Sequence, residues 1–230
     1  MDNGKNLGMA VIHRTTTLTP NKIELLTPWL PTRPWYVAGA AGPELTKAGG
    51  FRLDDPEGAV GIEFLVVTDA AGAQPTAYLV PLTYRGAPLD GAEHALVGTM
   101  EHGVLGRRWA YDGCHDPVLI AQLLALIEGR ARAQDQNISG APDTDVTRAY
   151  TGDGPVSVDV TAAAIDDPTG TELRGPHGTA IRLHRILRPV PDGAAVPPAE
   201  ATGHVSGSWQ LADGTRARAL FAVLYAGRGA

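Results

Sequence analysis

Three pairs of neighbouring histidine and carboxylate residues are the first candidates for chemistry in this chain. They are Glu93–His94, Glu101–His102 and His115–Asp116, and zinc and iron accept both kinds of ligand. A compact metal site on a helix needs a spacing such as His-x-x-x-His, which places two ligands on one face. No such spacing falls on a predicted helix here. We therefore predict no metal site and no cofactor, and interpret these histidines as surface or turn residues.

Cys114 is the single cysteine of the chain, so one molecule can form neither a disulfide nor a thiolate metal cluster. His115 would lower the pKa of the thiol if the two side chains met, as in activated cysteine nucleophiles. Adjacent residues rarely point at each other, however, and Asp116 is needed to cap a helix. Ser206–Ser208 lacks the Gly-x-Ser-x-Gly frame of a nucleophile elbow. We predict no catalytic residue, although an exposed Cys114 would be readily oxidised.

The tryptophans are Trp29, Trp35, Trp109 and Trp209. Aromatic faces can stack on sugar rings, but tryptophan more often anchors a hydrophobic core, especially in a chain with only 3 phenylalanines. Both interpretations stay open from the sequence alone.

Composition excludes several classes of function. The net charge is -6 and the pI is about 5.6, and no segment gathers enough Lys and Arg to neutralise several phosphates, so nucleic acid is not an expected partner. No apolar run approaches the roughly 20 residues of a membrane span, and the first residues lack the pattern of a leader peptide. We expect no membrane contact and a cytoplasmic location.

The elements that would position these residues are mainly short strands. A helix is expected from Thr19 as N-cap with Pro20 at its first position, followed by a meander of strands. A second helix should begin with Asp116 as N-cap and Pro117, and end at Gly129. The predicted strands of the meander are 50–54, 58–69, 76–84 and 104–111.

A polar stretch, residues 130–145, has the composition of a linker, and more strands follow it. Asp213-Gly214 predicts a tight hairpin between the last two strands. The predicted strands of this part are 156–162, 172–174, 179–187, 203–211 and 215–225.

We expect an α+β protein dominated by antiparallel sheet. It would have a mobile arm over residues 1–18, one domain over 19–148 and a β-rich part over 149–230. The sequence leaves open whether the last two share one sheet.

Three segments resemble the N-terminal cap region of actinobacterial maltokinases. They are Leu26–Tyr36, similar to "WLP…RWF", Ala77–Arg85, similar to "Y.VPL.YR", and Val104–Pro117, similar to "DG..DP". Their order and spacing carry the resemblance over roughly residues 25 to 145. It implies a cap domain with a curved antiparallel sheet packed against helices, somewhat like the cystatin fold.

Residues 149–230 resemble the first strands of a kinase N-lobe. Thr179–Leu187 is similar to the family pattern "LK.FRRL", whose lysine holds nucleotide phosphates, but Arg182 occupies that position. A guanidinium does not replace an ammonium neutrally. The family's catalytic loop and metal-binding Asp motif have no counterpart before Ala230, and phosphoryl transfer depends on such groups. We expect no kinase activity and no other enzymatic activity.

Two functions remain. The first is a non-catalytic cap-like protein that binds a protein partner, either an enzyme of glucan or maltose phosphate metabolism or a second copy of itself. The alternative is a protein that binds a carbohydrate or an aromatic metabolite between curved sheet and helix. Its candidate ligand-binding residues are Trp35, Tyr78, Tyr84 and Trp109.

Overall fold

The computed structural model describes residues 18–39, 41–138, 140–156, 164–190, 195–225 and 227. Strands dominate, and every strand pairing within these ranges is antiparallel, which confirms the expected sheet class. None of the helices in these ranges is long and apolar enough to span a membrane.

The strands are β1 (Leu18–Thr19), β2 (Leu45–Leu53), β3 (Gly61–Asp69), β4 (Thr76–Arg85), β5 (Leu96–His102), β6 (Gly106–Asp112), β7 (Thr147–Tyr150), β8 (Ala164–Asp167), β9 (Gly170–Arg174), β10 (Ala180–His184), β11 (Ile186–Leu187), β12 (Gly203–Gln210) and β13 (Arg216–Tyr225). The helices are α1 (Lys22–Trp29) and α2 (Pro117–Glu128), with 3₁₀ turns η1 (Leu30–Thr32), η2 (Glu93–Ala95), η3 (Gly113–His115) and η4 (Pro176–Gly178).

One sheet contains strands from both parts of the chain. Its order is β1-β5-β6-β4-β3-β2-β12-β13-β10-β9-β8, with β11 paired to β4 and β7 paired to β12. Trp209 on β12 lies opposite Gly49 on β2, where the two parts meet. Because β11 continues from β10 and returns to β4, the strands β4, β3, β2, β12, β13 and β10–β11 form a closed ring. The predicted boundary near residue 148 therefore does not divide the sheet.

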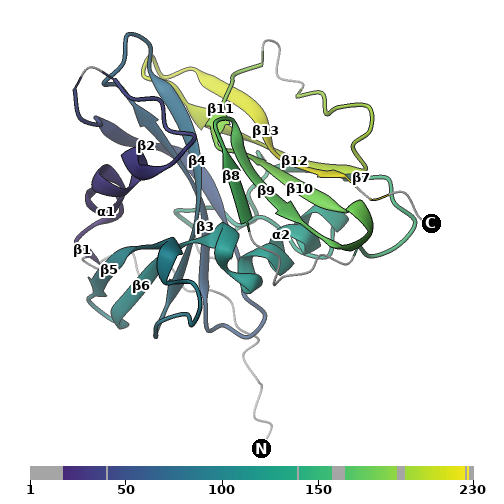
Figure 1. The fold of residues 1–230 in the computed structure, drawn as a ribbon, viewed down its shortest axis with the longest axis horizontal. Helices are drawn as coiled ribbons and strands as arrows, with labels where there is room; N and C mark the ends of the chain where they lie inside the picture. Colours follow the sequence, from purple (N-terminus) through teal and green to yellow (C-terminus); the bar gives the residue numbers. More distant parts are fainter. Residues whose placement is uncertain are drawn as a thin grey trace, which may run out of the picture.

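Two hydrophobic clusters cover opposite faces of β3. Phe64 and Val66 point into the larger cluster, which also contains α2 residues and apolar side chains of β9, β10, β12 and β13. Leu65 and Val67 point into the smaller cluster beside α1. This alternation is the two-residue period expected of a strand buried on both faces. The two helices accordingly lie on opposite sides of β3 and β4 (Figure 1).

The second helix forms as predicted, whereas the start of the first was predicted wrongly. Asp116 caps α2 by accepting a hydrogen bond from the Val118 N–H, and Gly129 ends it in the left-handed region at φ 82°. The cap of α1 is Asn21 rather than Thr19. Asn21 and Glu24 each accept a hydrogen bond from the other's backbone N–H, a capping box that satisfies two donors at once.

Several connections differ from the prediction. The strand expected from Val104 begins at Gly106, because residues 103–105 form the turn that joins β6 to the unpredicted β5. The expected linker is folded: Asp143 N–H donates to the Ala133 carbonyl and Asp135 N–H to that of Ala141. β7 and β8 were also not predicted. Most of the strand expected at 156–162, and the arm expected at 1–18 apart from Leu18 in β1, lie outside the described residues.

A fully buried ion pair ties the second part of the chain to the first. Arg185, between β10 and β11, is 0% exposed, and its Nη2 donates to Asp112 Oδ1 and Oδ2 at 2.7 and 2.6 Å. Its Nε donates to Thr171 Oγ1 at 2.7 Å, and its guanidinium lies 4.9 Å from the centre of the Trp35 ring. Burial raises the pKa of Asp112, but the charge and hydrogen bonds of Arg185 outweigh this and hold it below its ordinary value. The carboxylate is therefore ionised where it is buried.

We expect Asp112→Asn and Arg185→Met each to lower the free energy of unfolding by about 3–5 kcal/mol, because each leaves one buried charge without its partner. Replacing both, as Asp112→Leu with Arg185→Met, should cost less than the sum. Urea unfolding followed by tryptophan fluorescence measures all three. Glu101→Gln, in the exposed pair with Arg107, is the control and should cost about 0–1 kcal/mol. Single variants as stable as this control would contradict the assignment.

Candidate functional site

The four aromatic residues predicted to bind ligand do not line one cavity. Trp35 and Tyr78 are fully buried in the cluster beside α1, and Tyr84 packs against it with its hydroxyl donating to Glu63 Oε2 at 2.7 Å. Trp109 on β6 lies opposite Arg85 on β4. Because Arg85 and Tyr84 are adjacent on β4, their side chains point to opposite faces, so Trp109 projects from the face of the sheet opposite to that of Tyr84. It packs in a separate small cluster. The structure thus brings three of these rings together as core and places the fourth elsewhere.

Arg182, at the position compared with the kinase lysine, forms an ion pair on the sheet. It projects from β10, and its Nη2 donates to Asp167 Oδ1 at 2.6 Å. This hydrogen bond is the main reason why the pKa of Asp167 lies below its ordinary value. The guanidinium is therefore engaged by a carboxylate of the same chain.

Cys114 and the neighbouring histidines do not form a catalytic arrangement. Cys114 is 0% exposed, and burial raises the pKa of its thiol well above the ordinary value despite the nearby Arg185 charge. His115 contacts His94 instead, with Nδ1 and Nε2 3.1 Å apart. Within the described ranges, no group of three or more His, Cys, Asp or Glu side chains is arranged to hold a metal ion.

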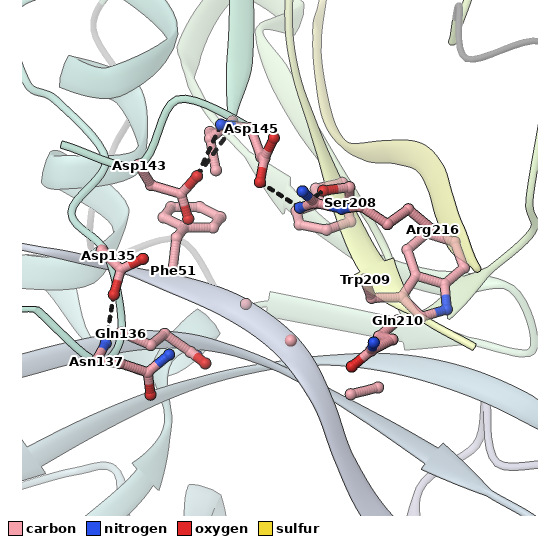
Figure 2. Close-up of a pocket in the computed structure, with 15 residues that line it drawn as sticks. Phe51, Asp135, Gln136, Asn137, Asp143, Asp145, Ser208, Trp209, Gln210 and Arg216 are labelled. Carbon is pink, nitrogen blue, oxygen red and sulfur yellow. Dashed lines mark hydrogen bonds and ion pairs between the residues drawn. The ribbon is translucent and has the colours of Figure 1, made fainter. Parts of the chain in front are cut away.

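A pocket of about 320 Å³ lies where the two parts of the sheet meet. Its walls come from β2, from residues 135–137 and 143–146 and from the β12–β13 hairpin (Figure 2). The polar side chains that line it are Asp135, Gln136, Asn137, Asp143, Asp145, Ser208, Gln210 and Arg216. The other lining residues are Ala48, Gly49, Gly50, Val146 and three aromatic residues, Phe51, Trp209 and Phe221, that are 0 to 2% exposed. Polar groups therefore provide most of the surface that a ligand would meet.

Two glycines on β2 form the floor of this pocket. Gly50 has φ +123°, and a Cβ there would lie 2.0 Å from the Phe64 carbonyl oxygen and 2.5 Å from Gln136 Nε2. A Cβ at Gly49 would lie 3.2 Å from Cα of Trp209. Only glycine at position 50 permits both this backbone and the close approach of the 135–146 segment.

The segment 135–146 holds its carboxylates through short turns. Asp135 Oδ1 accepts from the N–H groups of Asn137 and Ile138 at 2.6 and 2.9 Å. Asp143 Oδ1 accepts from those of Asp145 and Val146 at 2.8 and 3.3 Å. These Asx turns fix the carboxylates at the rim, where Figure 2 shows them on the side opposite Ser208 and Arg216.

Among the charged side chains that line the pocket, Arg216 and Asp145 form an ion pair, whereas Asp135 and Asp143 form none with the described residues. Arg216 forms an ion pair with Asp145 and, within the β12–β13 hairpin, donates to Ser208 Oγ at 2.7 Å (Figure 2). Partial burial raises the pKa of Asp143 and outweighs the two backbone hydrogen bonds that lower it, and the charges of Asp145 and Asp135 add a smaller increase. The site therefore offers amide hydrogen-bond donors on both sides, from Gln136 and Asn137 and from Gln210, together with unevenly compensated carboxylates.

Sequence reasoning missed this pocket because most of its polar residues lie in the stretch interpreted as a linker. Two signals were available. Asp135 and Asp143 lie in a polar stretch where aspartate often forms Asx turns, and Gly49-Gly50 interrupts an otherwise regular strand, which often marks close backbone approach. Trp209, a sequence candidate for sugar stacking, does line the pocket, but as a buried side chain.

The fold and the pocket define an antiparallel β-sheet protein with a polar cavity at the seam of its sheet. Residues 29–116 match the family model of the maltokinase N-terminal cap domain, which confirms the resemblance carried by the three motifs. This domain family is non-catalytic. The match covers fewer than half of the 230 residues, and the N-lobe resemblance of residues 149–230 is not confirmed. Comparison with curated proteins gives no match.

We expect Cys114 to react slowly with a disulfide reagent such as DTNB in the folded protein and rapidly in urea. The thiol is buried and its pKa is raised, so little thiolate is present or accessible. The rate of the Cys114 reaction with DTNB should depend on how often the protein unfolds, so the destabilising substitution Arg185→Met should increase this rate. Rapid stoichiometric labelling of the native protein, with unchanged circular dichroism, would contradict this environment.

Proposed function

We propose that this chain is a non-catalytic binding protein that holds a small, hydroxyl-rich ligand of the carbohydrate class in the pocket between β2, residues 135–146 and β12–β13. The observation that supports this most directly is the lining itself. It combines carboxylates, carboxamides and a guanidinium around one cavity, and such planar groups can each make two hydrogen bonds in fixed directions.

The hydrogen-bonding capacity of this lining suits hydroxyl groups. A hydroxyl both donates and accepts, so it can use a carboxylate of Asp143 and an amide N–H of Asn137 or Gln210 at the same time. The volume of about 320 Å³ lies at the lower end of the range typical of small-molecule sites. A monosaccharide-sized ligand is therefore more suitable than an oligosaccharide.

Aromatic stacking contributes little to this proposal. Trp209 is 2% exposed, so its face is covered by the protein rather than offered to a sugar. The proposed site therefore depends on polar contacts, and it replaces the aromatic set predicted from the sequence. Those rings are packed as core or lie on another face of the sheet.

We expect a monosaccharide that binds here to shift the NMR signals of Gly49, Asn137 and the Trp209 indole N–H in a saturable manner. Gln210→Ala should weaken binding severalfold, because it removes a rim amide while leaving the strand intact. Gln74→Ala, an exposed glutamine outside the pocket lining, is the matched control and should leave affinity unchanged. If Gln210→Ala bound the monosaccharide as tightly as Gln74→Ala, or if the NMR signals that shift all belonged to residues outside the pocket, the ligand would bind elsewhere.

A protein partner is the second candidate function. The family match favours it, because the matched domain is one that maltokinases carry at their N-terminus. The partner would be an enzyme of glucan or maltose phosphate metabolism, or a second copy of the chain. Under this proposal too the chain itself performs no phosphoryl transfer.

Sedimentation velocity distinguishes the partner types. We expect the chain to co-sediment with a purified maltokinase, or to form a dimer at micromolar concentration. Bovine serum albumin at equal mass is the negative control. A monomer over the whole concentration range that does not co-sediment with the enzyme would argue against this second function.

A further inference from the structure

The pocket contains more negative than positive side chains. Asp135, Asp143 and Asp145 line it, and Arg216 is the cationic residue among its lining side chains. Arg216 is already engaged by Asp145 and Ser208. The positive charge of the lining is therefore used within the protein.

Asp135 and Asp143 are held by backbone groups rather than by cations. In each, the recorded hydrogen bonds are from backbone N–H groups to Oδ1. Across the described ranges, no Lys, Arg or His forms an ion pair with either carboxylate. The charges of Asp135 and Glu63 both act to raise the pKa of Lys47, but Lys47 does not line the pocket. Asp143 is consequently the less compensated of the two.

The ionisation of Asp143 reports the same imbalance. Its pKa is raised by partial burial and by its two acidic neighbours, so a further negative charge in the pocket would be unfavourable. A positive group would be favourable, because it would relieve the repulsion among the three carboxylates.

We propose that the pocket selects its ligand by charge: a ligand bearing a protonated amine binds more tightly than its neutral hydroxyl analogue, and a phosphorylated analogue is excluded. Asp143 sets this preference, and Asp135 adds to it. For sugars, the inference rests on the proposed carbohydrate-binding function and narrows it to amine-bearing monosaccharides. The exclusion of anions is the repulsive half of the same specificity.

Three monosaccharides with the same pyranose ring test the preference: 2-amino-2-deoxyglucose and glucose, which are nearly equal in shape, and glucose 6-phosphate, which adds an anionic group at C6. NMR titration of the full chain at neutral pH should give a dissociation constant about fivefold lower for the amine than for glucose, since one charge contact at about 4 Å in water is worth this much. Glucose 6-phosphate should give no saturable shift. Equal affinities for all three would overturn the charge inference and leave the carbohydrate proposal standing.

Asp143→Asn tests the residue that we hold responsible. Asparagine keeps the Oδ1 acceptor of the turn, so the variant should fold, and the amine and glucose should then bind within about twofold of each other. Asp90→Asn removes an exposed carboxylate outside the pocket lining, and it should preserve the wild-type preference. A preference that persists unchanged in Asp143→Asn would contradict the assignment.

A non-sugar pair separates the two proposals. 1,4-Diaminobutane and 1,4-butanediol have the same length and differ in charge. Binding of the diamine alone, with no response to any sugar, would overturn the carbohydrate function while supporting charge selection. Failure of the diamine and of all three sugars to shift Gly49 or Asn137 would overturn both.

Discussion

The ion pair between Arg185 and Asp112 is the contact on which the arrangement of the whole sheet depends. Two charges buried to 0 and 1% exposure need each other and further hydrogen bonds to offset the loss of water, although Nη1 of Arg185 has no hydrogen-bond partner among the described residues. Arg185 is held by Asp112 and Thr171, and its own carbonyl accepts from the Leu79 N–H at 2.9 Å. Arg185 thus carries the buried positive charge and also links β10 to β11, the strand that closes the ring by pairing with β4.

The pocket lies at the other contact between the two parts of the chain, where β2 meets β12. Its floor belongs to β2 in the first part of the chain, and its far wall belongs to β12–β13 in the second. These strands meet at Gly49 and Trp209, and residues 135–137 and 143–146 line the pocket beside this contact. Neither part of the chain alone encloses the cavity, so the position of the site is set by long-range pairing rather than by any local motif.

This explains which features the sequence could predict. The capped helix α2, and the hairpin in which Gly214 has φ 83°, follow from residues within a few positions of one another. The ring closure, the Arg185–Asp112 pair and the pocket join residues more than seventy positions apart or lie in segments without hydrophobic periodicity. The capping box of Asn21 and Glu24 was local and readable, but the adjacent Thr19-Pro20 offered a competing signal.

The residues that carry the family resemblance hold the scaffold rather than the pocket. Arg85 and Asp116, from two of the similar segments, form a bidentate pair at 2.7 Å that fixes the start of α2 against β4. Trp35 and Asp112 surround Arg185. Among the pocket residues only 48–51 fall within the matched range, and all the charged ones lie beyond it. The matched residues therefore do not supply the charged lining of the pocket, because Asp135, Asp143 and Arg216 all lie outside the match.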